Sequence, residues 1–226
     1  MMKYNIISTG SKGNATIIND WILIDCGVSF RALREVYANL KIVLLTHIHS
    51  DHFRKSTICR LAKNRPTLRF ACGGWLVQGL IDCGVNKKNI DVLEAGKQYD
   101  YGLLSVSPVK LYHDVPNYGY RVFINGKKLF YATDTNTLEG ITAKGYDLYM
   151  VEANYEDEDI WNRIQKKREN GEYVYETGVL HTHLSRKKCD DFIYANIEPG
   201  GEYIYMHQHE DQGDKKCSCP QDTSRQ

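Results

Sequence analysis

The spacing of apolar residues along the chain alternates between a pattern typical of strands and one typical of helices. Continuous or β-branched apolar runs predict strands at residues 3–8, 15–19, 21–27, 41–46, 67–72, 103–113, 118–125, 128–134, 146–154 and 201–207. Apolar residues at helical spacing, or charged stretches, predict helices at residues 29–40, 54–64, 73–84, 156–171 and 184–197. Asn19-Asp20 and Asn125-Gly126 are typical of the tight turns that join hairpin strands.

Strands are followed by helices twice along the chain, and this order predicts the fold class. It favours two sheets packed face to face with helices outside, in a single α/β domain that forms an αββα sandwich. The 226 residues suit one generous domain better than two very small ones. We expect the domain to span residues 1–209 and residues 210–226 to form a polar, disordered tail.

Composition and charge exclude few functions. Hydrophobic residues are 42% of the chain, charged residues are 25%, and the net charge is +1, so no global field predicts binding to nucleic acid or membrane. The N-terminus does not resemble a signal peptide, and no window approaches the roughly 18 apolar residues of a membrane-spanning helix. We therefore expect a cytoplasmic protein without a membrane partner, and the sequence does not indicate its oligomeric state.

The seven cysteines are not expected to form a disulfide framework. They are odd in number, scattered and mostly set in apolar segments, as expected of small buried side chains in a reducing compartment. Cys217 and Cys219 could together bind a soft metal ion, but we interpret them as part of the polar tail.

The densest chemistry lies in residues 44–53, "LLTHIHSDHF", where three histidines and an aspartate fall within six residues after an apolar run. A solvated turn favours Asn, Gly, Asp and Ser instead. Imidazole and carboxylate ligands suit Zn²⁺, Fe or Mn, and the ends of buried strands are where such sites gather. His47 and His49 are two residues apart and can bind one ion together, while Asp51 and His52 can reach a second ion.

The segment "THIHSDH" resembles the H-x-H-x-D-H signature of the metallo-β-lactamase superfamily, and the resemblance covers roughly residues 3–209. It implies an αββα fold and two divalent metal ions, Zn²⁺ first, with Mn²⁺ or Fe as alternatives. The ligands that it implies are His47, His49 and His113 for the first metal, Asp51, His52 and His207 for the second, and Asp134 as a bridge.

Within that superfamily, the chain most resembles the YycJ/WalJ-type nuclease-like branch. The similarity rests on "STGSKGNATII", "HDVPNYGYRV", "VEANYEDE" and "HLSRKKCDDF". It implies a DNA exonuclease-like phosphodiesterase whose partner is nucleic acid or another phosphodiester. Relatives have a glycine where this chain has Thr182.

Two further residues are implied to act on the substrate. Glu152 ends a predicted buried strand, where an unpaired carboxylate would be costly. The resemblance implies that Glu152 orients His183, which contacts the scissile phosphate or protonates the leaving group. With Asp51 they form the implied catalytic set. A purely structural polar pair is the alternative, and His181 is interpreted as incidental.

Two positions near the predicted metals have competing interpretations. Asp25 could be a solvent-facing carboxylate at a strand end, but the resemblance implies that it orients the histidine loop by hydrogen bonds. His209 competes with His207 as the last ligand. His207 is preferred because it directly ends the predicted strand.

Two basic runs flank His183 in the sequence. Such runs are usually solvated faces, but beside the predicted site they could form an electrostatic footprint for phosphate. The residues are Arg186, Lys187 and Lys188 after it, and Arg163, Lys166, Lys167 and Arg168 before it.

The metal motif does not by itself name the substrate. Two metals provide a hydroxide nucleophile at neutral pH, which attacks phosphodiesters but also esters, lactones, thioesters and cyclic nucleotides. A flavodiiron-type redox site would need a carboxylate in place of His49, and a non-enzymatic interaction module usually loses loop ligands. We therefore predict a phosphodiesterase or nuclease, with the small-substrate hydrolase and then the interaction module as alternatives.

Overall fold

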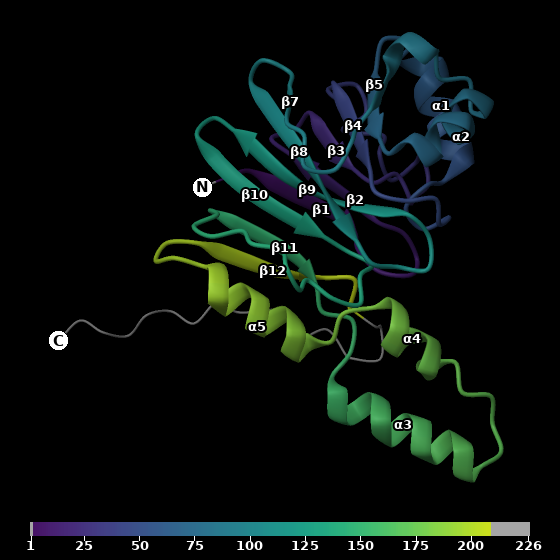
Figure 1. The fold of residues 1–226 in the computed structure, drawn as a ribbon. Coiled ribbons are helices and arrows are strands. Elements are labelled where there is room, and N and C mark those ends of the chain that lie inside the picture. Colours follow the sequence, from purple (N-terminus) through teal and green to yellow (C-terminus); the bar gives the residue numbers. More distant parts are fainter. Residues whose placement is uncertain (1, 209–226) are drawn as a thin grey trace.

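Two six-stranded sheets lie face to face in the computed structural model, which describes residues 2–208 (Figure 1). The first sheet contains, in spatial order, β1 (Tyr4–Ser8), β2 (Ala15–Ile18), β3 (Ile22–Ile24), β4 (Ile42–Leu45), β5 (Arg69–Cys72) and β6 (Ile90–Val92). Strands β3 to β6 are parallel, and β1 and β2 join them through antiparallel pairs. His209 and the predicted tail, with Cys217 and Cys219, lie outside the described residues.

The second sheet is also mixed. Its spatial order is β12 (Glu202–Met206), β11 (Leu148–Glu152), β10 (Lys127–Ala132), β9 (Asn117–Ile124), β8 (Leu104–Leu111) and β7 (Tyr99–Asp100). Strands β10, β11 and β12 are parallel, whereas β9 is antiparallel to both of its neighbours. Strand β8 therefore runs in the same direction as β10, β11 and β12.

Helices cover the outer faces of both sheets, which confirms the predicted αββα sandwich (Figure 1). Beside the first sheet lie α1 (Lys55–Asn64), α2 (Val77–Asp82) and the short 3₁₀ helices Gly74–Leu76 and Lys87–Asn89. Helix α5 (Arg186–Asn196) covers the second sheet. Three apolar clusters alternate with these layers, one between the sheets and one under each helical layer.

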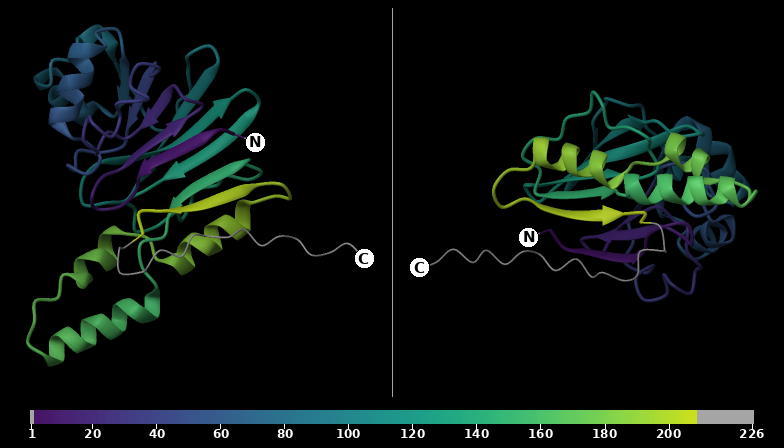
Figure 2. Two further views of the ribbon diagram at one scale, coloured as in Figure 1. Left: turned by 180° about the vertical axis from the view of Figure 1, so that it is seen from behind. Right: turned by 90° about the horizontal axis from the view of Figure 1, so that it is seen from below.

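Helices α3 (Asp157–Glu169) and α4 (Glu176–Thr182) form an arm that projects from the sandwich in Figure 1 and in the left view of Figure 2. The arm has a small apolar cluster of its own around Ile160 and Ile164. Within residues 2–208, no helix has the length and apolar character needed to cross a bilayer.

The predicted helix at residues 29–40 is wrong, because this segment forms a series of turns. Most of its backbone hydrogen bonds join residues three apart, such as Leu33 to Phe30 and Val36 to Leu33, and only Tyr37 to Leu33 spans four. The apolar spacing nevertheless predicted correctly which side chains are buried, since Leu33 and Leu40 pack in the cluster under the first sheet. Helix α4 and the short strands β6 and β7 were not predicted.

Candidate metal centre

The predicted site residues converge because most of them follow the carboxyl ends of strands that run in one direction. This edge is where layered α/β folds collect ligands. Asp25 follows β3, His47 follows β4, His113 follows β8, Asp134 follows β10, Glu152 ends β11 and His207 follows β12.

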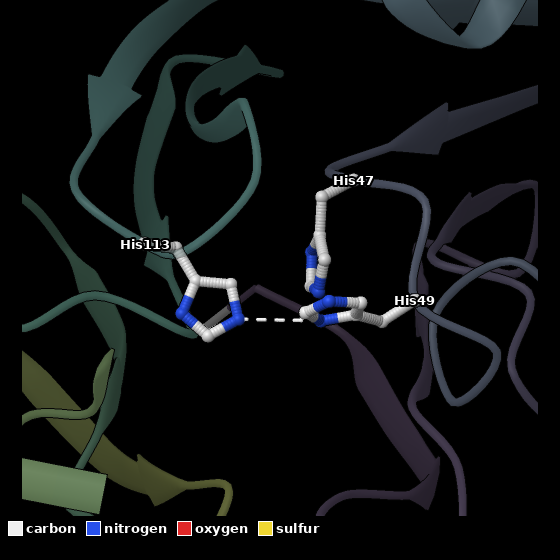
Figure 3. A group of neighbouring side chains, drawn as sticks. All are labelled: His47, His49 and His113. Carbon is white, nitrogen blue, oxygen red and sulfur yellow. Dashed lines mark hydrogen bonds between the residues drawn. The ribbon is translucent and has the colours of Figure 1, made fainter. Parts of the chain in front are cut away.

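His47, His49 and His113 form one group whose ligand atoms all lie within 4.8 Å of one another (Figure 3). The Nδ1 atom of His49 is 3.3 Å from Nε2 of His113. The Nδ1–H of His113 donates to the carbonyl oxygen of Thr182 at 2.9 Å, because that oxygen can only accept. The hydrogen bond fixes the tautomer of His113 and leaves the Nε2 lone pair directed at the group.

His47 is fully buried and has the properties of a neutral ligand. Burial lowers its pKa far below the ordinary value. Its Nε2 atom has no hydrogen-bond partner among residues 2–208. A buried nitrogen lone pair without a partner is costly, and coordination of a metal ion would satisfy it.

Asp51, His52 and His207 form a second group with ligand atoms within 4.8 Å of one another. The Oδ2 atom of Asp51 lies 3.6 Å from Nε2 of His52 and 3.9 Å from Nε2 of His207. The structure thus brings the last predicted histidine, which is distant in sequence, to the histidine loop.

A buried hydrogen-bond network orients His52. Its Nδ1 atom lies 2.7 Å from Oδ2 of Asp25. The other carboxylate oxygen of Asp25 accepts from the backbone N–H and the hydroxyl of Thr46, each at 2.9 Å. Asp25 is fully buried, so the structure places it against His52 and away from solvent.

Asp134 lies between the two groups. Its Oδ2 is 2.7 Å from Nε2 of His52, and its Oδ1 is 2.7 Å from Nδ1 of His207. Its ligand atoms also form a group with those of His47 and His52. Burial alone would raise the pKa of Asp134, but His52 and His207 lower it well below its usual range. The carboxylate therefore stays charged and available to a cation.

The electrostatic field at His52 favours positive charge. Burial acts to lower its pKa, but Asp134 and Asp25 outweigh burial and raise the pKa well above the ordinary value. Two carboxylates facing one imidazole stabilise a cation between them, whether a proton or a metal ion.

His183 and Glu152 lie in contact beside these groups, and together with Asp134 and His207 they form a further group with ligand atoms within 4.8 Å of one another. The Nδ1–H of His183 donates to Oε1 of the fully buried Glu152 at 2.5 Å. The other oxygen of Glu152 accepts from the backbone N–H groups of Thr135 and Leu184 at 2.9 and 3.3 Å, which holds the carboxylate rigidly. Burial opposes a charge on His183, but Glu152 raises its pKa to about 9. His183 Nδ1 is 3.4 Å from Oδ1 of Asp134.

The backbone is strained at three of these positions. Asp25, Asp134 and His207 have φ angles of +60°, +56° and +50°, in the left-handed region that residues with a side chain rarely adopt. Among residues 2–208, the other non-glycine residues with positive φ are Asn19, Asp20 and Asn125, at the predicted hairpin turns. Strain outside turns is typical of functional sites, where it directs side chains inward from strand ends.

Sequence reasoning missed two side chains at the centre. The amide Nδ2 of Asn14 lies 2.7 Å from Nε2 of His52, and its Oδ1 accepts from Gly10 N at 2.8 Å. Asp114 Oδ1 lies 3.1 Å from Nε2 of His113. The position of Asp114 directly after a predicted ligand could have indicated it, whereas Asn14 has no local signal.

The basic residues after His183 differ in their contacts. Lys188 Nζ donates to the carbonyl oxygen of Asn136 at 3.1 Å, near Asp134. The guanidinium of Arg186 lies 3.6 Å from the ring centre of Tyr205. Lys187 is exposed on α5, where it faces Asp191 at 3.5 Å.

The basic run before His183 contributes to the arm. Lys167 Nζ lies 2.6 Å from Oε1 of Glu176 and 3.9 Å from the ring centre of Tyr175. These contacts join α3 to the start of α4. Lys166 and Arg168 are exposed on α3.

Comparison with known proteins identifies the family. Residues 20–187 match the profile of the beta-lactamase superfamily domain, so the chain belongs to the beta-lactamase superfamily. Its members are mostly metal-dependent hydrolases. No curated protein matches the sequence significantly.

Solved structures with the metallo-β-lactamase fold resemble the chain throughout. The protein YhfI from Bacillus subtilis aligns with a TM-score of 0.69 and 17% identity, over 92% of this chain and 86% of that one. The short form of human tRNase Z aligns with a TM-score of 0.64 and 15% identity, over 92% of each chain. PqqB from Methylobacterium extorquens, solved with bound Zn²⁺, aligns with a TM-score of 0.65 and 13% identity, over 92% of this chain and 89% of that one.

The residues present fit divalent metal ions. The donors are imidazole nitrogens and carboxylate oxygens grouped within 4.8 Å of one another, a set that suits Zn²⁺, Mn²⁺ or Fe. The partnerless Nε2 of His47 and the field at His52 favour a cation in the same place.

Proposed function

We propose that this protein is a dinuclear-metal phosphodiesterase, and within that class a DNA exonuclease-like nuclease. The pair of Glu152 and His183 carries the proposal, because a metal centre alone does not require it. His183 donates its Nδ1–H to a rigidly held carboxylate, so its Nε2 is free to face a substrate. The pair lies within contact distance of Asp134, next to both ligand groups.

In this proposal His47, His49 and His113 would hold one ion, and Asp51, His52 and His207 would hold a second. Asp134, which lies between these groups, would be a ligand shared by both ions. When bound, such ions supply an activated water at neutral pH and neutralise charge on a phosphate.

The protein's own residues position the ligands and stabilise charge on the substrate. Asp25 holds His52 in place through its Nδ1 atom, and the Thr182 carbonyl holds His113 in the same way. His183, as a cation beside Glu152, stabilises the negative charge that develops on the phosphate oxygens or gives its Nε2 proton to the leaving oxygen.

Three further observations support a nucleic-acid substrate. The sequence resembles the YycJ/WalJ-type branch, two structural neighbours are named tRNase Z and RNase Z, and Lys188 adds positive charge near Asp134. Arg186 and Lys187 follow at the start of α5, where they lie 3.5 Å from the carboxylates of Asp190 and Asp191 and so add little net charge.

The test is an activity screen of the full chain loaded with Zn²⁺ or Mn²⁺. The substrates are 5′-labelled single- and double-stranded DNA, RNA and bis-p-nitrophenyl phosphate, with a lactone and a thioester beside them. We expect phosphodiester cleavage that a chelator abolishes. Cleavage of the lactone or thioester without any phosphodiester would reject the nuclease and leave a metallohydrolase. If the fully metal-loaded protein cleaves none of these substrates, the result would favour a non-enzymatic interaction module.

A further inference from the structure

Tyr112 has a large exposed side chain and directly precedes a proposed metal ligand in the sequence. Its side chain is 49% exposed, and the next residue is His113. Among the exposed large hydrophobic residues of the described chain, Ile48 is the other one that neighbours a proposed ligand in sequence. The tip of Ile48 lies near Gly79 of α2, whereas Tyr112 has a cation for a neighbour.

The backbone of Tyr112 is fixed on both sides. Its N–H donates to Thr135 Oγ1 at 3.1 Å, and its carbonyl accepts from Asn136 N at 2.9 Å. Both partners follow Asp134 in the sequence. An exposed aromatic residue on a rigid backbone loses little conformational entropy when a ligand stacks on it.

Two lysines place positive charge around Tyr112. Lys110 Nζ lies 5.7 Å from the centre of the Tyr112 ring. Lys188 Nζ bonds to the carbonyl of Asn136, the same residue whose N–H holds Tyr112. The carboxylate of Asp114, the next residue after His113, lies 3.1 Å from Nε2 of His113 and would repel phosphate there. The charge distribution thus favours a phosphate chain that leaves the centre over Tyr112.

We propose that Tyr112 is a stacking platform for an unpaired nucleobase next to the scissile phosphate, with Lys110 and Lys188 binding the adjoining backbone. This inference rests on the proposed function and names its substrate as single-stranded nucleic acid or an unpaired end. A base inside a duplex is already stacked on its neighbours, so its face is not available to the tyrosine ring.

Binding is measured by fluorescence anisotropy with a short, labelled single-stranded oligonucleotide and full-length, metal-loaded protein. Every variant carries His183→Ala, so that cleavage is slow and binding is read independently of catalysis. Tyr112→Ala should raise the Kd by about 5- to 150-fold, the range expected for loss of one base–aromatic stack. Tyr112→Phe keeps the ring and should bind like its parent. Tyr194→Ala removes a 63% exposed ring from α5 and is the matched control.

An abasic series separates stacking from a structural effect. For the parent protein, removing the base at one position of the oligonucleotide should weaken binding as much as Tyr112→Ala does. Removing the same base should not weaken binding by the Tyr112→Ala variant any further. Three outcomes would each overturn the platform. Tyr112→Ala could lose as much affinity, relative to its parent, for every abasic strand as for the intact strand. The parent could fail to bind single strands, or it could bind blunt duplex equally tightly. If the platform holds but the wild type cleaves no phosphodiester, only the proposed function fails.

The lysines are tested by salt dependence. Lys110→Ala and Lys188→Ala should each lower the slope of log K against log salt by about 0.7, the loss of one phosphate contact on a single strand. Lys87→Ala, in the 3₁₀ helix that precedes β6, is the control and should keep the parental slope. An unchanged slope in both lysine variants would remove them from the platform.

Discussion

The two sheets contribute to the metal centre in different ways. The first sheet delivers His47, His49, Asp51 and His52 in one six-residue loop after β4, whereas the second delivers three proposed ligands from three separate strand ends. The loop is held by close packing and buried hydrogen bonds. The ligands of the second sheet depend on strand register and strained backbone. We call the residues that each sheet contributes one half of the site. Substitutions in the two halves should therefore have different effects.

Removal of Asp134 should have the largest effect, because its carboxylate contacts both halves. We expect the wild type to hold about two metal ions per chain after reloading. Asp134→Ala should abolish hydrolysis and lose at least one ion while keeping the fold. Elemental analysis, activity and circular dichroism measure the three effects. A folded Asp134→Ala protein with full activity would contradict the bridging role, and a wild type without bound metal under any loading condition would contradict the centre itself.

The next largest effect should come from His183, which belongs to the second half but is not a proposed ligand. His183→Ala should lower phosphodiester cleavage by about 10²–10⁴-fold, the usual contribution of general acid catalysis, with metal content unchanged. Glu152→Gln should lower it less, because the imidazole remains but is less well oriented.

The leaving group provides the control for His183. The loss should shrink for p-nitrophenolate, which needs little protonation. Losses of equal size on good and poor leaving groups would indicate that His183 binds the phosphate and does not donate a proton to the leaving group.

A substitution at Asp25 tests the first half, because Asp25 contacts the proposed ligand His52 without being a ligand itself. Asp25→Asn keeps the shape of the side chain but removes the negative charge that faces His52. It should weaken binding of the second metal by about 10–100-fold, which metal titration against a competing chelator measures. Asp20→Asn is the control, because Asp20 is exposed in a hairpin turn and pairs with Lys3. Equal affinities in both variants would show that Asp25 does not act on the metal.

The difference between the halves also explains how much the sequence could predict. The loop ligands are contiguous, so their spacing alone indicated a metal site. His113, Asp134 and His207 could be assigned only through a family resemblance, because no local pattern shows that distant strand ends meet. Most strands were predicted well, since buried runs and turn residues are local signals, whereas the short strands β6 and β7 were missed. Asn14 was missed because its contact with His52 exists only in the folded chain and leaves no local signal in the sequence.

Packing at Gly27 gives the smallest and most local test of the first half. A Cβ atom at Gly27 would lie 1.6 Å from the carbonyl oxygen of Asp51, so Gly27→Ala must displace the histidine loop. We expect the free energy of unfolding to fall by about 1–3 kcal/mol, as for overpacked sites, with weaker metal binding. Gly178→Ala is the matched control, because it lies in α4 with no atom within 4 Å of its added Cβ. In a helix this change should be neutral or stabilise by up to about 1 kcal/mol. Chemical denaturation of both variants measures the contrast, and similar stabilities would show that the loop tolerates movement and that its ligands are not held by close packing.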